Sequence, residues 1–232
     1  VLTDDNFATI EAAIEEGRGV FDNLIKFIAW TLPTNMGEGL VVLAAVFLGV
    51  TLPLSPLQIL WINMTTAMLL GLMLAFEKKE EGIMLRPPYP AGRPILDAAL
   101  VGRICLVASM MLICAFGFFR LTQALGGSLE QARTAAVNVF VLIEIFYLFN
   151  CRSLTRSPLE VGLFSNRWVI GGVLGMAALQ LLFTYSSGMN RVFGSAPLGV
   201  FFWVLIGAAG LATYLLVEGE KRLRRRIVSQ PK

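Results

Sequence analysis

Six long apolar stretches dominate the chain, and short polar or charged segments separate them. A helix needs about 20 mostly apolar residues to cross the hydrocarbon core of a bilayer. The stretches are too long for the strands of a membrane barrel, and they do not alternate with a period of two. The pattern therefore predicts an all-α membrane protein with six transmembrane helices. These lie at approximately Phe27–Val50, Leu57–Phe76, Ile95–Phe119, Thr134–Asn150, Trp168–Tyr185 and Leu198–Val217.

The first 26 residues follow a different pattern. Apolar residues recur at helical spacing, and Glu11, Glu15 and Glu16 lie on the wetter side of that helix. We expect a cytoplasmic helical stalk that continues into the first span. The chain then divides into the stalk (1–26), a six-helix transmembrane domain (27–217) and a basic cytoplasmic tail (218–232).

Basic residues gather on one side of the expected membrane. With six spans both termini share a side, and all but three of the 19 Lys and Arg residues lie there. The exceptions are Arg120, Arg133 and Arg191. Because cytoplasmic loops carry an excess of Lys and Arg, this distribution predicts that both termini are cytoplasmic. The short loops favour a bacterial plasma membrane.

Composition agrees with a membrane location and excludes several kinds of chemistry. Hydrophobic residues make up 56% of the chain and charged residues 15%, whereas soluble domains carry about 25% charged residues. Histidine is absent, which excludes imidazole metal sites and His general bases. The net charge of +3 does not suggest a nucleic-acid partner. The three cysteines have no paired spacing, so neither a disulfide framework nor a zinc site is expected.

Polar residues inside the expected spans are the candidates for function, because they are costly in a membrane. In the first span, Asn35 and Glu38 are three residues apart and share a helix face. Pro33 precedes them and lacks an N–H group, which leaves the Ala29 carbonyl without its helical partner. Amide, carboxylate and carbonyl oxygens together suit a hard cation.

Further oxygen donors occur in two other spans. Asn63 and Thr66 repeat the three-residue spacing in the second span, and Glu144 is the only other deeply placed carboxylate. Another interpretation is that such residues only form hydrogen bonds between helices. That interpretation is favoured for Asn138.

Several short motifs carry a family resemblance. They are VLTDDNF at 1–7, IEEGR at 14–18, NMGE at 35–38, LWINMTT at 60–66, FE at 76–77, MLRPP at 84–88 and IE at 143–144. In this order they resemble P-type cation ATPases: the segment after the TGDGVND motif, the fifth and sixth membrane helices, the following loop, and the eighth-helix site. The match is closest to the calcium-pump and sodium-pump branch.

The resemblance implies the C-terminal membrane region of such a pump, with the end of its phosphorylation domain inside residues 1–26. By position, the ligands of the transported cation would be Asn35, Glu38, Asn63, Thr66 and Glu144. Calcium is the first candidate, and sodium, potassium, magnesium and manganese are the alternatives. The implied partners are the lipid bilayer, the actuator, nucleotide and phosphorylation domains, and the first four membrane helices. ATP and magnesium would act in the full-length parent.

Two departures from the family pattern are visible. Ala67 stands where calcium and sodium pumps have an Asp, which lowers the negative charge of the site. The sequence also contains no DKTGT phosphorylation motif. We therefore expect that this chain alone contains no catalytic residues, binds no cofactor and is inactive as an ATPase.

Two other functions remain open from the sequence. The chain could be a self-contained six-helix secondary transporter or channel for cations, since a helix broken near a buried carboxylate also suits ion exchange. It could also be a non-catalytic module that packs against a membrane partner.

Overall fold

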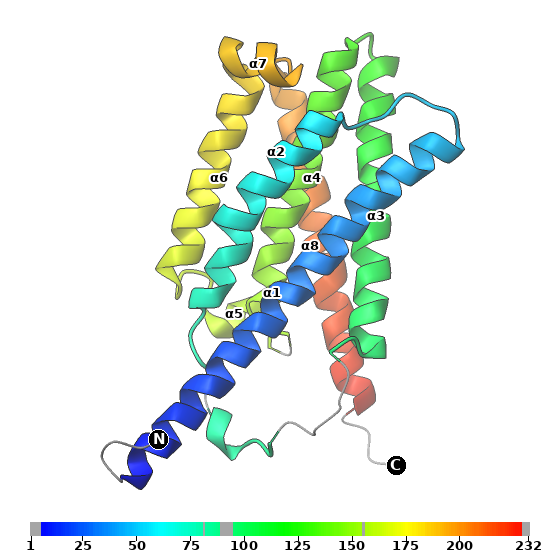
Figure 1. The fold of residues 1–232 in the computed structure, drawn as a ribbon. Helices are drawn as coiled ribbons and strands as arrows, with labels where there is room; N and C mark the ends of the chain where they lie inside the picture. The colour runs from blue at the N-terminus through cyan, green and yellow to red at the C-terminus, as the bar shows by residue number, and fades with distance from the viewer. Residues whose placement is uncertain (1–5, 81, 89–94, 155, 229–232) are drawn as a thin grey trace.

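The computed structural model describes residues 6–80, 82–88, 95–154 and 156–228, and this part of the chain contains helices and no strands (Figure 1). Residues 1–5 of the first motif, residues 81, 89–94 and 155, and the end of the basic tail (229–232) lie outside the described residues. The α-helices are α1 (Phe7–Phe47), α2 (Pro56–Thr66), α3 (Ala98–Ala124), α4 (Leu129–Cys151), α5 (Pro158–Val161), α6 (Arg167–Tyr185), α7 (Ser187–Phe193) and α8 (Val200–Val228).

Three further helical turns connect these elements. A π-helical turn, η1 (Ala67–Gly71), continues α2, and a 3-10 turn, η2 (Leu72–Phe76), follows it directly. A second 3-10 turn, η3 (Ile83–Leu85), lies in the loop before α3. The second expected span therefore exists, but its second half departs from α-helical geometry.

Five helical segments of the described residues are long and apolar enough to cross a membrane. They are Pro56–Phe76, Ala98–Ala124, Leu129–Cys151, Arg167–Tyr185 and Val200–Arg225. These segments match the second to sixth expected spans and support an all-α integral membrane protein. The first expected span is not among them, because the polar residues Asn35 and Glu38 interrupt its apolar sequence.

Helix α1 is continuous over 41 residues. The side chain of Asn6 accepts a hydrogen bond from the Ala8 N–H at 3.0 Å and caps its start. Neither Gly17 nor Pro33 ends the helix. In Figure 1, α1 is inclined to the other long helices, and its N-terminal part projects beyond them.

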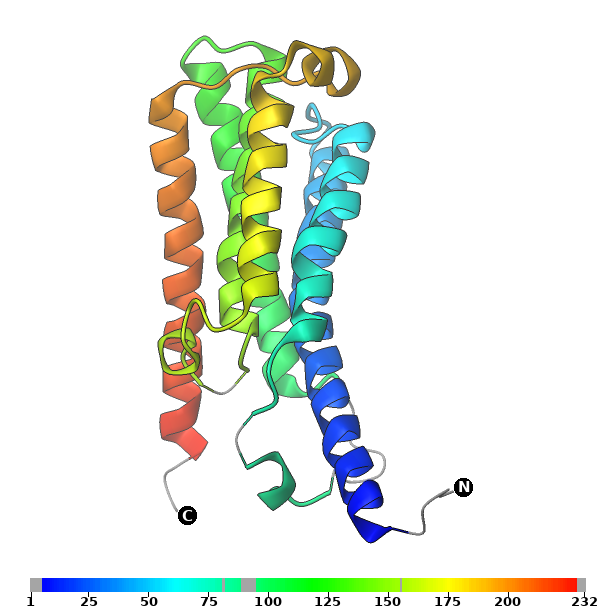
Figure 2. The same ribbon diagram turned by 90° about the vertical axis from the view of Figure 1, so that its left-hand side faces the viewer.

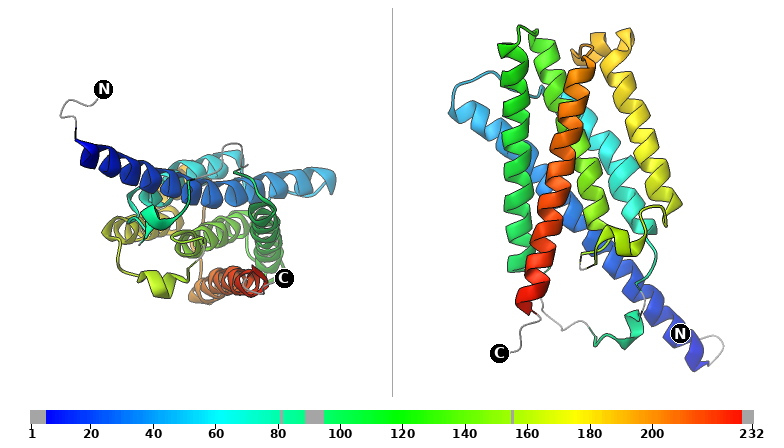
Figure 3. Two further views of the ribbon diagram at one scale, coloured as in Figure 1. Left: turned by 90° about the horizontal axis from the view of Figure 1, so that it is seen from below. Right: turned by 180° about the vertical axis from the view of Figure 1, so that it is seen from behind.

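Helix α4 is the central element of the bundle. Its start carries a capping box, in which Ser128 and Gln131 satisfy each other's backbone N–H groups. Most of its residues are buried, and it packs against α3 and α8 while also contacting α1, α2 and α6. Figure 3 shows it between α1 and α8 when the bundle is viewed from below.

The long helices alternate in direction, so both ends of the described chain lie at one end of the bundle (Figure 2). We call this the termini end. The turn η3 and the short helix α5 also lie there, whereas α7 lies at the opposite end. The arrangement follows from the sequence, because no connection between the expected spans contains a further apolar stretch long enough to cross a membrane.

The loop after α2 is bound to the N-terminal half of α1. The Arg18 guanidinium donates to the carbonyl oxygens of Ile83 and Arg86 at 2.9 and 2.7 Å. Arg86 in turn forms an ion pair with Asp22 at 2.6 Å. Lys79 pairs with Glu16 and Glu15, and the hydrogen bond that its ammonium donates to Glu16 is the main cause that raises the pKa of Lys79.

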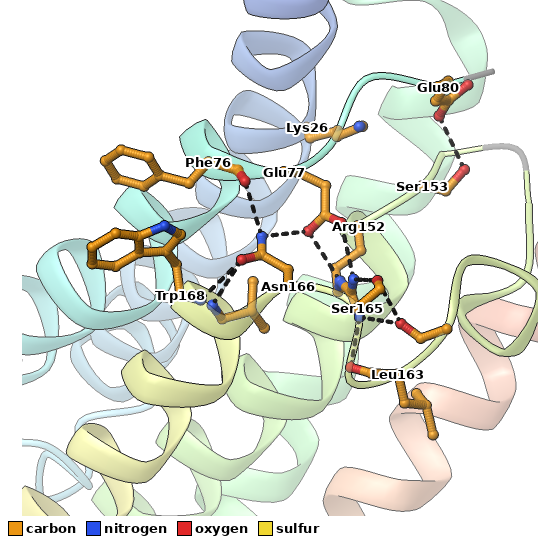
Figure 4. Close-up of polar contacts among 12 residues, drawn as sticks. Lys26, Phe76, Glu77, Glu80, Arg152, Ser153, Leu163, Ser165, Asn166 and Trp168 are labelled. Atoms are coloured by element: carbon orange, nitrogen blue, oxygen red, sulfur yellow. Dashed lines mark hydrogen bonds and ion pairs between the residues drawn. The ribbon is translucent and has the colours of Figure 1, made fainter. Parts of the chain in front are cut away.

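A buried ion pair joins the residue after η2 to the residue after α4 at the termini end (Figure 4). Arg152 donates from Nε to Glu77 Oε2 at 3.0 Å and from Nη2 to Glu77 Oε1 at 2.9 Å. The side chains of Arg152 and Glu77 are 0% and 2% exposed. The remaining Arg152 donors bind the carbonyls of Gly162 and Leu163 and the hydroxyl of Ser165. Because the guanidinium is fully satisfied, the pair tolerates its burial.

Two asparagines extend this pair to α6 and α1. Asn166 donates to Glu77 Oε2 at 2.9 Å, and its Oδ1 accepts from the Trp168 N–H at the start of α6 (Figure 4). Asn23 on α1 donates to the backbone carbonyls of Ala75 and Glu77 at 3.1 and 2.8 Å. The termini ends of α1, α2, α4 and α6 therefore share one hydrogen-bonded network.

Arg152→Met should lower the free energy of unfolding by about 3–5 kcal/mol, because the Glu77 carboxylate would stay buried without a partner. The measurement is a denaturant titration of the purified protein in detergent micelles. Lys79→Met is the control, since an exposed ion pair contributes little to stability.

The double variant Glu77→Leu/Arg152→Met removes both charges and should recover most of the loss. Equal destabilisation by the single and double variants would contradict a role for the uncompensated charge.

Candidate functional site

Two acidic side chains from different helices meet inside the bundle. Glu38 on α1 is 6% exposed and Glu144 on α4 is 2% exposed. They lie close enough to interact electrostatically. One oxygen of each carboxyl group, Glu38 Oε1 and Glu144 Oε2, is buried and has no hydrogen-bond partner among the described residues.

Helix α2 supplies neutral oxygen and nitrogen groups to the same place. The Asn63 amide donates to Glu38 Oε2 at 2.5 Å and to the Ile59 carbonyl at 3.1 Å. The Thr66 hydroxyl donates to the Ile62 carbonyl at 2.9 Å and lies near the carboxyl group of Glu144. Four of the five candidate residues therefore gather where α1, α2 and α4 meet.

Asn35 is the fifth candidate and is not part of this cluster. Its side chain is exposed, as is that of its neighbour Met36, whereas Glu38 is buried. The sequence placed Asn35 and Glu38 on one helix face, but the difference in burial shows that they meet different surroundings. Asn35 faces away from the rest of the described chain.

The cluster offers a cation an incomplete set of ligands. Two like-charged carboxylates in one buried space repel each other, and a cation between them would offset that cost. A calcium ion takes six to eight oxygen ligands. Among the described residues, no three His, Cys, Asp or Glu side chains come together as a metal site. Further oxygens would therefore have to come from neutral groups, water or other parts of the protein.

The irregular part of α2 begins directly after these donors. Thr66 ends the α-helical part, and η1 widens the helix before η2 tightens it. π-Helical turns occur mostly as single-turn insertions inside α-helices, and these are frequent at functional sites. This turn could not be predicted, because neither Pro nor a Gly pair interrupts residues 61–70.

Two hydrogen bonds fix α1 against α4 near the carboxylates. Trp30 Nε1 donates to the carbonyl of Glu144 at 3.1 Å. Tyr147 OH donates to the carbonyl of Ala29 at 2.7 Å. That carbonyl is the one left without a helical partner by Pro33, and in the structure it accepts this hydrogen bond from α4. Trp30 and Tyr147 were missed as positioning residues, because their partners are more than 100 residues away in the sequence.

Asn138 illustrates the purely structural use of a polar residue. Its amide donates to the Thr134 carbonyl at 2.9 Å and to the Thr184 hydroxyl at 3.0 Å, which joins α4 to α6. Its side chain is buried and none of its atoms lacks a partner among the described residues. The expectation of a hydrogen bond between helices is confirmed here.

Comparison with known proteins identifies the family. Residues 51–223 match the family model described as "Cation transporting ATPase, C-terminus". The chain belongs to the cation-transporting ATPase family. It is the C-terminal region of a P-type cation ATPase, as its motifs predicted.

Relatives in this family are similar along nearly the whole chain. The "Probable cation-transporting ATPase F" of Mycobacterium tuberculosis is 56% identical over 231 residues, which cover 100% of this chain. The "Calcium-transporting ATPase" of Bacillus subtilis is 35% identical over 93% of the chain, and the "Calcium-transporting ATPase 1" of Schizosaccharomyces pombe is 34% identical over 97%. The chain spans about a quarter of the length of these relatives.

Tyr147→Phe should lower the free energy of unfolding by about 1 kcal/mol, because the Ala29 carbonyl would stay buried without a donor. The matched control is Tyr214→Phe on α8, since the Tyr214 hydroxyl makes no hydrogen bond within the described part of the chain. Denaturant titration in micelles measures both. Equal effects of the two substitutions would show that the hydroxyl of Tyr147 does not support α1.

Proposed function

We propose that the chain is the C-terminal membrane domain of an ATP-driven cation pump and supplies part of its intramembrane cation site. The observation that carries this proposal is the buried pair of Glu38 and Glu144, each with an oxygen that lacks a partner. Such oxygens are costly inside a protein unless a ligand satisfies them. Family membership supplies the class of ligand, since relatives are named for cation transport.

In this proposal the cation exchanges water for oxygens of Glu38, Glu144, Asn63, Thr66 and Asn35. The first four already lie together, whereas Asn35 faces outward. The exposed side of α1 that carries Asn35 and Met36 would face another membrane helix of the full-length pump. That helix would complete the ligand set. Ala67 is also exposed and contributes no oxygen from its side chain.

The membrane arrangement is part of the same proposal. Residues 27–50 would form a sixth span alongside the five apolar segments, and residues 1–26 would form a stalk that transmits movement from the phosphorylation domain. Both termini would face the cytoplasm of a bacterial cell, because the termini end carries most basic residues. ATP and magnesium would bind to the cytoplasmic domains of the parent pump.

Calcium is the proposed cargo. Two of the similar relatives are named calcium-transporting ATPases, and carboxylate and amide oxygens are the ligands that calcium prefers. Ala67 reduces the charge of the site relative to calcium and sodium pumps, which favours one bound ion over two. Sodium, potassium, magnesium and manganese are the competing cargoes for the same test.

Glu38→Gln in the full-length parent should raise the cation concentration needed for half-maximal phosphorylation by at least about tenfold, because it removes a charged ligand. Each candidate cation is titrated in turn, and the cargo is the one whose response shifts. Glu130→Gln is the matched control, since Glu130 is exposed at the start of α4. An unchanged response for every cation would exclude Glu38 as a ligand. Cation flux through liposomes that contain only this chain, without ATP, would instead favour a secondary transporter.

A further inference from the structure

The π-helical turn η1 lies one residue beyond Thr66 in the chain. The N–H of Leu72 donates to the carbonyl of Ala67, five residues earlier, which is the bond that defines this geometry. A π-helical turn is rare and has poorer intrinsic stability than an α-helical one, so neighbouring contacts must hold it. The structure contains such a contact on each of two sides.

On one side, α6 approaches the turn with its backbone at Gly172. A Cβ atom added at Gly172 would lie 1.9 Å from the carbonyl oxygen of Leu69 and 2.7 Å from Met73 Cγ. Real Cβ atoms essentially never show contacts under 3.0 Å. Only glycine therefore allows this approach, because any other residue would push the Leu69 backbone away from α6 by about 1 Å.

On the other side, α1 covers the end of the turn with two aromatic rings. A Cβ atom added at Gly71 would lie 2.8 Å from Phe27 Cε2 and from Trp30 Cζ3. Trp30 is the residue whose indole N–H binds the carbonyl of Glu144. The turn is thus enclosed between α6 and the same part of α1 that is bonded to the acidic residue on α4.

We propose that Gly172 is a positioning residue for the cation site, which it serves by holding the η1 turn of α2 against α6. This inference rests on the proposed function. The turn sets the direction in which α2 leaves the site, and Thr66 and Asn63 lie within the turn of helix before it. Moving the Leu69 carbonyl away from α6 displaces those donors from the two carboxylates, although Gly172 itself touches no ligand.

The test is Gly172→Ala in the full-length parent pump, with Gly171→Ala as the matched control. Gly171 is the preceding residue of the same helix, and an added Cβ there meets no atom within 4 Å. Gly172→Ala should raise the calcium concentration for half-maximal phosphorylation by roughly tenfold, as changes behind metal ligands do. The ATP concentration for half-maximal phosphorylation should stay unchanged, since a general loss of structure would alter both. Gly171→Ala should match the wild type in both measurements.

Two further variants separate the backbone contact from other causes. Adding Met73→Ala to Gly172→Ala removes the side-chain clash and leaves the clash with the Leu69 carbonyl, so calcium affinity should stay low. Full recovery in that double variant would overturn the proposal. Gly71→Ala disturbs the turn from its other side and should also lower the affinity for calcium. It decides the question if Gly172→Ala does not accumulate as folded protein.

Glu38→Gln measured in parallel separates this inference from the proposed function. A normal calcium response in Gly172→Ala together with a weakened one in Glu38→Gln would overturn the inference and leave the cation site in place. Normal responses in both variants would overturn the site as well.

Discussion

The rest of the structure depends on one constraint, which is that polar groups between membrane helices must find their partners within the protein. Pro33 frees the carbonyl of Ala29 in the middle of α1, and Tyr147 of α4 satisfies it at 2.7 Å. Trp30 makes the reciprocal bond from α1 to the carbonyl of Glu144 on α4 at 3.1 Å. Because the two bonds run in opposite directions between the same helices, they fix both rotation and register. That register brings Glu38 to Glu144.

The network around Glu77 and Arg152 applies the same constraint at the termini end of the bundle. It holds the end of η2 to the end of α4, to the start of α6 and, through Asn23, to α1. These elements are therefore held at two levels, one beside the carboxylates and one where the chain leaves the bundle. Between these two levels the chain continues from α2 through the η1 and η2 turns. Asn63 and Thr66 therefore have little freedom to move along the helix axis. A change in the geometry of η1 is then the change that can displace them from the carboxyl groups.

Much of the fold and part of the site could be predicted from the sequence, for reasons that are local. Apolar length decides whether a segment can span a bilayer, so five expected spans match helical segments to within a few residues, except that the last helix extends further. The meeting of Glu38, Asn63, Thr66 and Glu144 could be expected, because polar residues in apolar runs usually face the interior of a helix bundle. Spacing could not show that Asn35 faces outward. It gives the direction of a side chain around its own helix, but not which other helix, if any, lies in that direction. Arg152 and Glu77 lie 75 residues apart in the sequence, and no local pattern predicts that they form a pair.

The contrast between satisfied and unsatisfied groups bears on how the proposed site would work. The Arg152 guanidinium uses its donors on five acceptors, and a group so fully paired has no reason to exchange partners. Glu38 and Glu144 each keep an oxygen open in the same bundle. A transport site must bind its ion and then release it, so its ligands need an arrangement that is tolerable without the ion. The Asn63 amide provides this for Glu38, because it donates to one carboxylate oxygen while the other stays open. The carboxyl groups of Glu38 and Glu144 can therefore change partners at a lower cost than the fully paired Arg152 guanidinium can.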